Sequence, residues 1–245
     1  MTFDIHALAR ENGQKLAQNP YPGRGIVLGT SPDSNFFVQV YWIMGRSENS
    51  RNRVFVMDEQ GFVRTRAYDE SKLTDPSLIL YYPARHLDRC HIISNGDQTD
   101  TVFFAMQEGK DMEKALQLRE FEPDSPNFTP RITGIMDMLE NRSVYTLSIL
   151  KSMGHDVSLG CLRQSYTYEK ALPGIGHCIT TYQGDGNPLP SFQGEPYPMS
   201  IPATAEETLD YYWDLLNKDN RVSILVKWIN RLTFAGQIVI RNKHG

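Results

Sequence analysis

A run of polar residues at 92–101, I-I-S-N-G-D-Q-T-D-T, has the composition of an anion-binding turn. Asn95-Gly96 is a strong turn signal, because both residues tolerate positive φ. Asp97 or Thr99 would then cap a helix over 102–107. Backbone N–H groups are left unpaired where a helix starts, so the run predicts a site for an anionic ligand. The alternative is a plain capped turn.

Arginines stand at the ends of the predicted strands, beside Gly, Asn, Ser or Thr. They are Arg24 in Y-P-G-R-G, Arg46, Arg51 and Arg53 in G-R-S-E-N-S-R-N-R, Arg85 in Y-Y-P-A-R and Arg131 in N-F-T-P-R-I. Guanidinium groups match phosphate in shape and charge. In a chain of net charge −4 this placement favours a pocket for a small anion. For any single arginine, the alternative is a solvated surface role.

Other familiar chemistry is missing from the sequence. No G-x-x-x-x-G-K-[ST] or G-x-S-x-G motif occurs, and Gly174-Ile-Gly176 leads into a strand, which does not fit a dinucleotide fold. His86, Cys90 and His91 cluster, but neighbours at 90 and 91 point to opposite faces of a strand. We therefore predict no metal site, and the histidine and cysteine cluster is kept as the alternative.

The composition is that of a globular protein. The 245 residues are 40% hydrophobic and 22% charged, and their net charge of −4 gives no indication of nucleic-acid binding. Three cysteines favour a reducing compartment over a disulfide framework. No apolar run approaches the length of a membrane span, and the first twenty residues resemble no secretory signal. We expect a cytoplasmic protein with no membrane partner.

The elements that must position these side chains are mostly strands. A helix is predicted over 5–18 with Asp4 as its cap, two short helical patterns over 102–119, and a helix after a capping box at Thr204. We expect 184–202, rich in Gly and Pro, to be an ordered loop. The predicted strands are 25–30, 36–44, 54–58, 62–67, 78–82, 91–93, 132–138, 144–153, 161–168, 177–182, 222–229 and 232–240. This pattern indicates an α+β protein with antiparallel sheets.

The motifs occur in an order that resembles the archaeal-type IMP (inosine monophosphate) cyclohydrolases over roughly residues 21–215. They are G-R-G-I-V-L-G, R-S-E-N-S-R-N-R, Y-Y-P-A-R, I-S-N-G-D-Q-T-D-T, F-E-P-D-S-P-N-F-T-P-R-I and I-T-T-Y-Q. The S-N-G-x-x-T-D and T-P-R-I blocks are the most specific. The chain departs from the family in the predicted helix of residues 1–20, in its longer Arg46 block and in an expanded C-terminal half.

The resemblance implies a single domain over 1–245, with residues 1–20 as an added helix. It implies a four-layer αββα sandwich similar in architecture to the N-terminal-nucleophile hydrolases, but without their mechanism. The implied reaction closes the ring of 5-formamidoimidazole-4-carboxamide ribonucleotide to give inosine monophosphate and water. The implied partner is a purine ribonucleotide and no cofactor is implied. The oligomeric state stays open, a homo-oligomer included.

By the same resemblance Tyr81 and Glu122 fall on active-site positions. We expect Tyr81 to hydrogen-bond the reacting amide or formyl group and Glu122 to take or orient a proton. The other expected roles are phosphate binding by Arg24, Arg46 and Arg53, further substrate contacts by Arg85, Asn95, Thr99 and Asp100, and support of Glu122 or the substrate by Arg131.

Two other functions remain open. Thr2 would become N-terminal after loss of Met1 and could act as an amide-hydrolase nucleophile, although a threonine there could equally cap the first helix. A purine-nucleotide-binding protein without catalysis is the third hypothesis, and the presence of both Tyr81 and Glu122 weighs against it.

Overall fold

Two antiparallel sheets form the centre of the computed structural model, which describes residues 3–73, 76, 78–138 and 144–244. Sheet A has the order β11 (Tyr197–Ser200), β10 (Ile175–Thr180), β1 (Gly25–Thr30), β2 (Phe36–Met44), β12 (Arg221–Asn230), β13 (Gly236–Asn242). Sheet B has the order β3 (Val54–Met57), β4 (Val63–Arg66), β5 (Ala84–Leu87), β6 (Cys90–Ser94), β7 (Arg131–Asp137), β8 (Tyr145–Met153), β9 (Asp156–Tyr168). These sheets and the few helices agree with the predicted α+β class.

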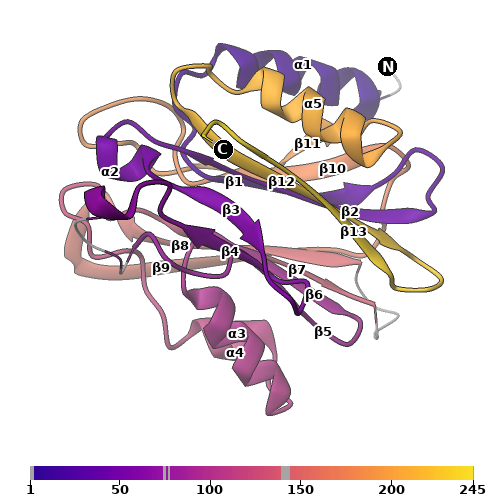
Figure 1. Cartoon of the computed structure of the whole chain (residues 1–245), viewed down its shortest axis with the longest axis horizontal. Coiled ribbons are helices and arrows are strands. Elements are labelled where there is room, and N and C mark those ends of the chain that lie inside the picture. Colours follow the sequence, from indigo (N-terminus) through magenta and orange to yellow (C-terminus); the bar gives the residue numbers. More distant parts are fainter. Residues whose placement is uncertain (1–2, 74–75, 77, 139–143, 245) are drawn as a thin grey trace.

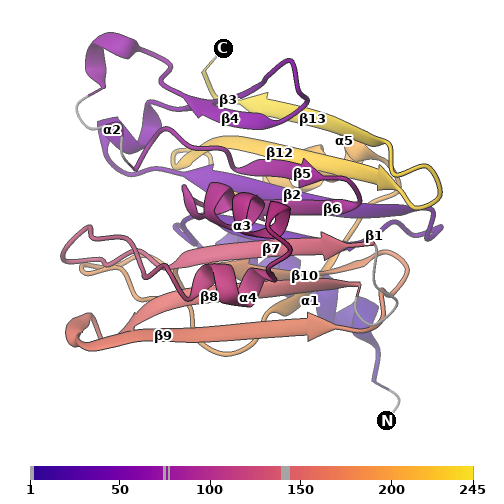
Figure 2. The same cartoon turned by 90° about the horizontal axis from the view of Figure 1, so that it is seen from below.

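Helices cover the outer face of each sheet. Figure 1 shows α1 (Ile5–Gln18) and α5 (Ala205–Leu215) over sheet A. Seen from below in Figure 2, α3 (Gln98–Gln107) and α4 (Met112–Leu116) lie over sheet B. The remaining short elements are α2 (Glu48–Arg51) and a 3₁₀ turn at Glu70–Lys72.

The central strands of sheet A are buried on both faces, so they appear in the sequence as continuous apolar runs. Val40 and Trp42 pack toward α1 and α5, while Tyr41 and Ile43 pack into the layer between the sheets. This follows from the two-residue period of a strand. Tyr41 therefore carries a hydroxyl into the layer between the sheets.

The first helix begins as predicted. The Asp4 carboxylate accepts hydrogen bonds from the backbone N–H groups of His6 and Ala7 at 3.0 and 3.1 Å, so it satisfies two donors that a helix start leaves free. Leu16 lies in the apolar core beneath α5, and α1 also contacts β11. No helix in the described ranges is long and apolar enough to cross a membrane.

The prediction of a strand over 78–82 was wrong. The backbone N–H groups of Ile79 and Leu80 donate to the Pro76 carbonyl at 3.0 and 2.9 Å, which makes a turn, and the strand begins only at Ala84. Apolar side chains alone could not reveal this turn. Tyr81 therefore lies on a connecting segment, where Thr65 of β4 holds its backbone.

The prediction that 184–202 has no strand was also wrong. It contains β11, which pairs with β10 at the edge of sheet A. Pro198 has no N–H to donate, and an edge strand tolerates this because one of its sides is unpaired. The last strand starts at Gly236, later than predicted, because Asn230 to Ala235 form a turn.

Candidate active site

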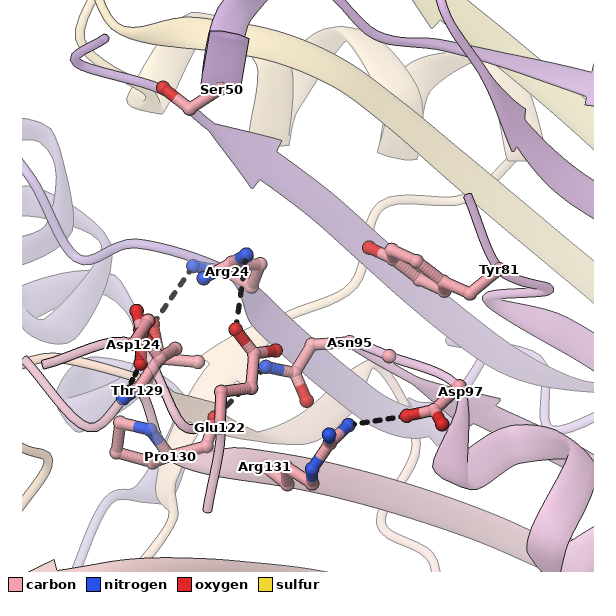
Figure 3. Close-up of polar contacts among 12 residues, drawn as sticks. Arg24, Ser50, Tyr81, Asn95, Asp97, Glu122, Asp124, Thr129, Pro130 and Arg131 are labelled. Atoms are coloured by element: carbon pink, nitrogen blue, oxygen red, sulfur yellow. Dashed lines mark hydrogen bonds and ion pairs between the residues drawn. The ribbon is translucent and has the colours of Figure 1, made fainter. Parts of the chain in front are cut away.

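Chain segments from both sheets meet at one end of the layer between them, and they bring together most of the predicted site residues. Arg24 precedes β1, Arg53 precedes β3, and Arg131 is the first residue of β7. Tyr81 and Glu122 come from loops. Figure 3 shows Glu122 facing Arg24, while the Tyr81 hydroxyl points toward the same region from a separate segment. The arginines thus gather at element ends, as their positions in the sequence predicted.

Glu122 is held by a compact loop built from F-E-P-D-S-P-N-F-T-P-R-I. Its backbone N–H donates to the Thr129 carbonyl at 2.9 Å, and the Thr129 N–H donates to Asp124 Oδ1 at 2.6 Å. The Glu122 side chain is 2% exposed. Burial raises the pKa of Glu122 above its ordinary value of 4.5, although Arg24 and Arg131 oppose the rise. A carboxylate with a raised pKa is a stronger proton acceptor than an ordinary one, which suits it to general acid–base catalysis.

Arg24 faces this carboxyl group without a direct hydrogen bond to it. Its Nη2 lies 3.7 Å from Glu122 Oε2, and its buried Nε has no hydrogen-bond partner in the described part of the chain. Burial is the largest single influence and lowers the pKa of Arg24, but Glu122 and the neighbouring tyrosines together raise this pKa well above its ordinary value. The guanidinium therefore stays charged and keeps unused donors.

Arg53 is a buried cation with no ion-pair partner among the described residues. It is 2% exposed, and Nε donates to the Ser50 carbonyl at 3.0 Å. Across the residues described, no carboxylate lies within ion-pair distance of its guanidinium. Burial, and then the neighbouring charge of Arg24, lowers the pKa of Arg53. Burying an unpaired charge raises the free energy of the folded protein, so this position is suited to bind an anion.

Tyr81 lies near enough to Arg24 and Arg53 for their charges to act on its hydroxyl. Its hydroxyl is 2.7 Å from the hydroxyl of Tyr41, and Thr65 fixes its backbone through two hydrogen bonds of 2.9 Å. Burial raises the pKa of Tyr81 although Arg53 and Arg24 oppose it, and burial also raises the pKa of Tyr41. Both hydroxyls are therefore protonated at neutral pH. If Tyr41 donates to Tyr81, the Tyr81 proton is free for a ligand.

A pocket of about 240 Å³ opens beside these groups. It is lined by Tyr21, Arg24, Arg46, Ser47, Ser50, Arg53, Asp124, Asn127, Thr129, Tyr182 and Leu189. Arg46 lies over the Tyr21 ring, pairs with Asp185 and donates to the Gly186 carbonyl at 3.1 Å. The three predicted phosphate-binding arginines thus line one pocket, and Asp185 currently neutralises one of them.

The polar run at 92–101 holds the neighbouring segment 130–132 in place through hydrogen bonds. Asn95 Nδ2 donates to the Pro130 carbonyl at 2.9 Å, and its Oδ1 accepts from the Ile132 N–H at 2.8 Å. Arg131 Nη1 donates to Asp97 and Gln98 at 2.7 and 2.8 Å. These bonds tie the S-N-G turn to the T-P-R-I block. A Cβ at Gly96 would lie 2.6 Å from Gln98 Oε1 and 2.7 Å from Arg131 Nη1, so a larger residue there would displace these two side chains.

Asp97 does not cap the following helix with its side chain, so that prediction was wrong. Its backbone is already helical and its carboxylate pairs with Arg131 and Arg119 instead. Thr99 does not supply the cap either, since it bonds Ser94 and the Gly96 carbonyl. The polar side chains of this turn therefore already have partners within the protein.

Arg85 and Asp100 lie apart from the other site residues. Arg85 Nη1 pairs with Asp100 at 2.6 Å. The guanidinium lies 3.7 Å from the centre of the Phe103 ring and 4.8 Å from that of Phe62, which belong to the core between sheet B and its helices. The structure therefore does not bring this pair together with Arg24 and Glu122.

Several residues in or beside the pocket were not predicted from the sequence. Thr129 bonds both Asp124 and Tyr182, and all three line the pocket. They stand inside the quoted F-E-P-D and I-T-T-Y-Q motifs, which could have indicated them. Tyr41 stands in the run F-F-V-Q-V-Y-W-I-M and had no polar neighbour to single it out.

The family model described as IMP cyclohydrolase-like protein matches residues 21–232. The chain belongs to this family. It is also similar to the IMP cyclohydrolase of Methanopyrus kandleri, with 31% identity over 121 residues, which cover 48% of this chain and 59% of the relative. The match thus spans less than two thirds of that relative, and α1 lies ahead of the family match.

The metal alternative concerned the cluster of His86, Cys90 and His91. His86 and His91 stack at 5.6 Å, while Cys90 points into the core on the other face of β6. Among the residues that the structure describes, no group of three or more His, Cys, Asp or Glu is arranged to hold a metal ion.

Proposed function

We propose that this chain is an IMP cyclohydrolase, which closes the ring of 5-formamidoimidazole-4-carboxamide ribonucleotide with loss of water. The observation that carries the proposal is the buried Arg53, which has no ion-pair partner among the described residues, near Arg24 and the carboxyl group of Glu122. This combination offers an anion site in the arginine pocket and, 3.7 Å from the Arg24 guanidinium that lines it, a proton-transfer group. Membership of the family and the name of the Methanopyrus kandleri relative support the choice of reaction.

We also propose that the two sheets and their covering helices form the αββα sandwich of the family, similar in architecture to the N-terminal-nucleophile hydrolases. The helices over both outer faces in Figures 1 and 2 support this. The site then lies at one end of the central layer, where the Tyr41 hydroxyl meets the loops.

The reaction needs mainly the right geometry. The carboxamide nitrogen attacks the formyl carbon of the same molecule, and the resulting carbinol oxygen leaves as water. Holding these two groups together in a near-attack conformation supplies much of the rate. The remaining requirements are a hydrogen-bond donor for the formyl oxygen and a group that accepts the amide proton.

Tyr81 and Glu122 suit these two roles. Tyr81 stays protonated and has Tyr41 as a hydroxyl partner, so it can donate to the formyl oxygen as negative charge develops there. Glu122 in its carboxylate form can accept the amide proton, and its raised pKa favours return of that proton to the departing oxygen. Arg131, near Gly96 and Glu122, supports the carboxylate.

Arg24, Arg46 and Arg53 would bind the 5′-phosphate. A phosphate dianion would provide the counter-charge that Arg53 lacks and would compete with Asp185 for Arg46. Charge-assisted hydrogen bonds of this kind are short and strong. The phosphate would thereby hold the base against Glu122 and Tyr81.

The direct test is to mix purified protein with the formylated ribonucleotide and to follow the ultraviolet absorbance of the hypoxanthine ring. We expect catalytic turnover that persists in the presence of a chelator. Activity that a chelator abolishes and zinc restores would reverse the assignment in favour of the metal alternative. Tight binding of inosine monophosphate without any turnover would instead indicate the non-catalytic nucleotide-binding protein.

A further inference from the structure

A second cavity, of about 300 Å³, lies between α1 and the segment 180–197. Its lining residues are Asn12, Lys15, Leu16, Asn19, Thr180, Gln183, Phe192, Gln193, Glu195 and Tyr197. The first four have the spacing of one face of a helix, so α1 supplies a continuous wall. This helix precedes residue 21, where the family match begins. The volume is at the lower end of small-molecule pockets, roughly 300–1,000 Å³.

The charges of this cavity differ from those of the arginine pocket. Lys15 already pairs with Glu11 at 2.8 Å, and Glu195 adds a negative charge at the rim. No arginine lines the cavity. The cavity therefore has no unpaired cation to bind a phosphate group. An uncharged ligand fits this lining better than an anionic one.

The wall combines an apolar surface with amide groups. Leu16 and Phe192 are 3% and 5% exposed, and the Phe192 and Tyr197 rings stack at 6.5 Å. Asn12 is 8% exposed, and its Nδ2 donates to the Pro198 carbonyl at 2.9 Å. Its Oδ1 accepts no hydrogen bond from the described residues and is the free acceptor of a nearly buried side chain.

Aromatic rings beside primary amides match a flat ligand whose edge carries adjacent donors and acceptors. Asn and Gln amides pair with such an edge in two hydrogen bonds, as they do with adenine. Gln183 and Gln193 add two amides to that of Asn12. We propose that this cavity is a second ligand site, for an uncharged nucleobase or nucleoside.

The cavity is one loop away from the arginine pocket. Gln183 and Phe192 line the cavity, whereas Leu189, between them in sequence, lines the arginine pocket. Lys151 Nζ holds the Phe192 carbonyl at 2.6 Å, and Asn127 accepts from the Leu189 N–H at 3.1 Å. The segment is therefore fixed between the two pockets.

The test is binding of adenine to the full chain, measured by shifts of assigned backbone NMR signals. We expect saturation at millimolar concentration or below, with the largest shifts in α1 and residues 180–197. Gln193→Trp fills the cavity from an exposed position and should weaken binding at least tenfold. Gln14→Trp places the same side chain on an exposed position of α1 outside the cavity and should leave binding unchanged.

Two further measurements separate the pockets and the type of recognition. Arg53→Met alters only the arginine pocket, so it should leave adenine binding intact. Indole, which is flat but lacks the acceptor edge, should bind at least tenfold more weakly than adenine. No saturation with adenine, loss of binding in Arg53→Met but not in Gln193→Trp, or equal binding of indole would each overturn the proposal. None of these readouts requires catalytic turnover, so the proposal can fail or succeed independently of the cyclohydrolase assignment.

Discussion

Arg53 and Arg85 both stand at the start of a strand of sheet B, yet their surroundings are opposite. Arg85 has a carboxylate partner in Asp100 at 2.6 Å and four aromatic rings around its guanidinium. Arg53 is more deeply buried and has no carboxylate partner among the described residues. A cation that the protein has already satisfied contributes to structure. A buried cation without an ion-pair partner is suited to bind an anionic ligand, and this difference is the basis of the proposed roles of the two arginines.

The largest expected effect comes from the groups next to the unsatisfied arginines. Glu122→Gln and Tyr81→Phe each keep the side-chain volume and remove one proton-transfer or hydrogen-bonding function. We expect kcat to fall by roughly 10²- to 10⁴-fold in each case, because proton transfer by a positioned side chain contributes about that much. Single-turnover kinetics and a thermal melt should show lost chemistry in a folded protein. Wild-type turnover in either variant would disprove the role of that residue.

The pH dependence gives an independent check on Glu122. The base must be deprotonated, so activity should fall as the pH drops through the pKa of Glu122. Because burial raises that pKa, the acidic limb of the kcat/KM profile should lie above pH 4.5. In Glu122→Gln this limb should disappear from the residual activity. An unchanged limb would assign it to another group.

The matched pair Arg53→Met and Arg85→Met tests the comparison itself. Arg53→Met should raise KM by roughly 10- to 150-fold, equivalent to about 1.5–3 kcal/mol for a hydrogen bond to a charged group. It should also raise the melting temperature of the ligand-free protein, because it removes an unpaired buried charge. Arg85→Met should do the reverse, with an unchanged KM and a lower melting temperature, since it breaks the Asp100 pair. Equal KM effects would mean that Arg85 binds substrate as first predicted.

Asp185→Asn should produce a smaller change in the opposite direction. The Asp185 carboxylate pairs with Arg46 and competes with a phosphate for it, but the pair is partly exposed and such pairs contribute only about 0.2–1 kcal/mol. We expect KM for the ribonucleotide to fall two- to fivefold, with kcat unchanged. Asp210→Asn, which breaks the exposed Arg241 pair, is the control and should leave KM as it was. A rise in KM would instead show that Asp185 positions Arg46.

The sequence predicted the elements better than the contacts. Strands with a clear apolar run, such as 25–30 and 36–44, have the predicted bounds, and Asp4 caps α1 as its position suggested. The sequence alone could not reveal which side chains of neighbouring segments are already paired. Asp97 is a residue type that often caps helices. Here, however, its carboxylate forms ion pairs with Arg131 and Arg119 instead of bonding the N–H groups at the start of the helix. Arg53 and Arg85 differ only in such long-range partners, so their sequence contexts could not separate them.

Thr2→Ala should have the smallest effect, and it separates the cyclohydrolase from the N-terminal-nucleophile alternative. Thr2 lies outside the described residues, so the hypothesis that it is a nucleophile stays untested. In such an enzyme the free amine of residue 2 is the base, and both Thr2→Ala and an added N-terminal tag would abolish turnover. In the proposed mechanism the reacting groups meet Tyr81 and Glu122 between the sheets, and α1 lies on the outer face of sheet A.

The stability readout makes this comparison sharper. Asp4 accepts the two hydrogen bonds of the first turn of α1, so Thr2→Ala should leave the melting temperature unchanged, while Asp4→Ala should cost about 1 kcal/mol. We expect a tagged Thr2→Ala protein to have wild-type kcat, and Asp4→Ala to lose stability but not kcat. If Thr2→Ala gave a folded protein without activity, the first residues would have to reach the reacting atoms. It would then make the amide hydrolase the better hypothesis, despite the unpaired arginines.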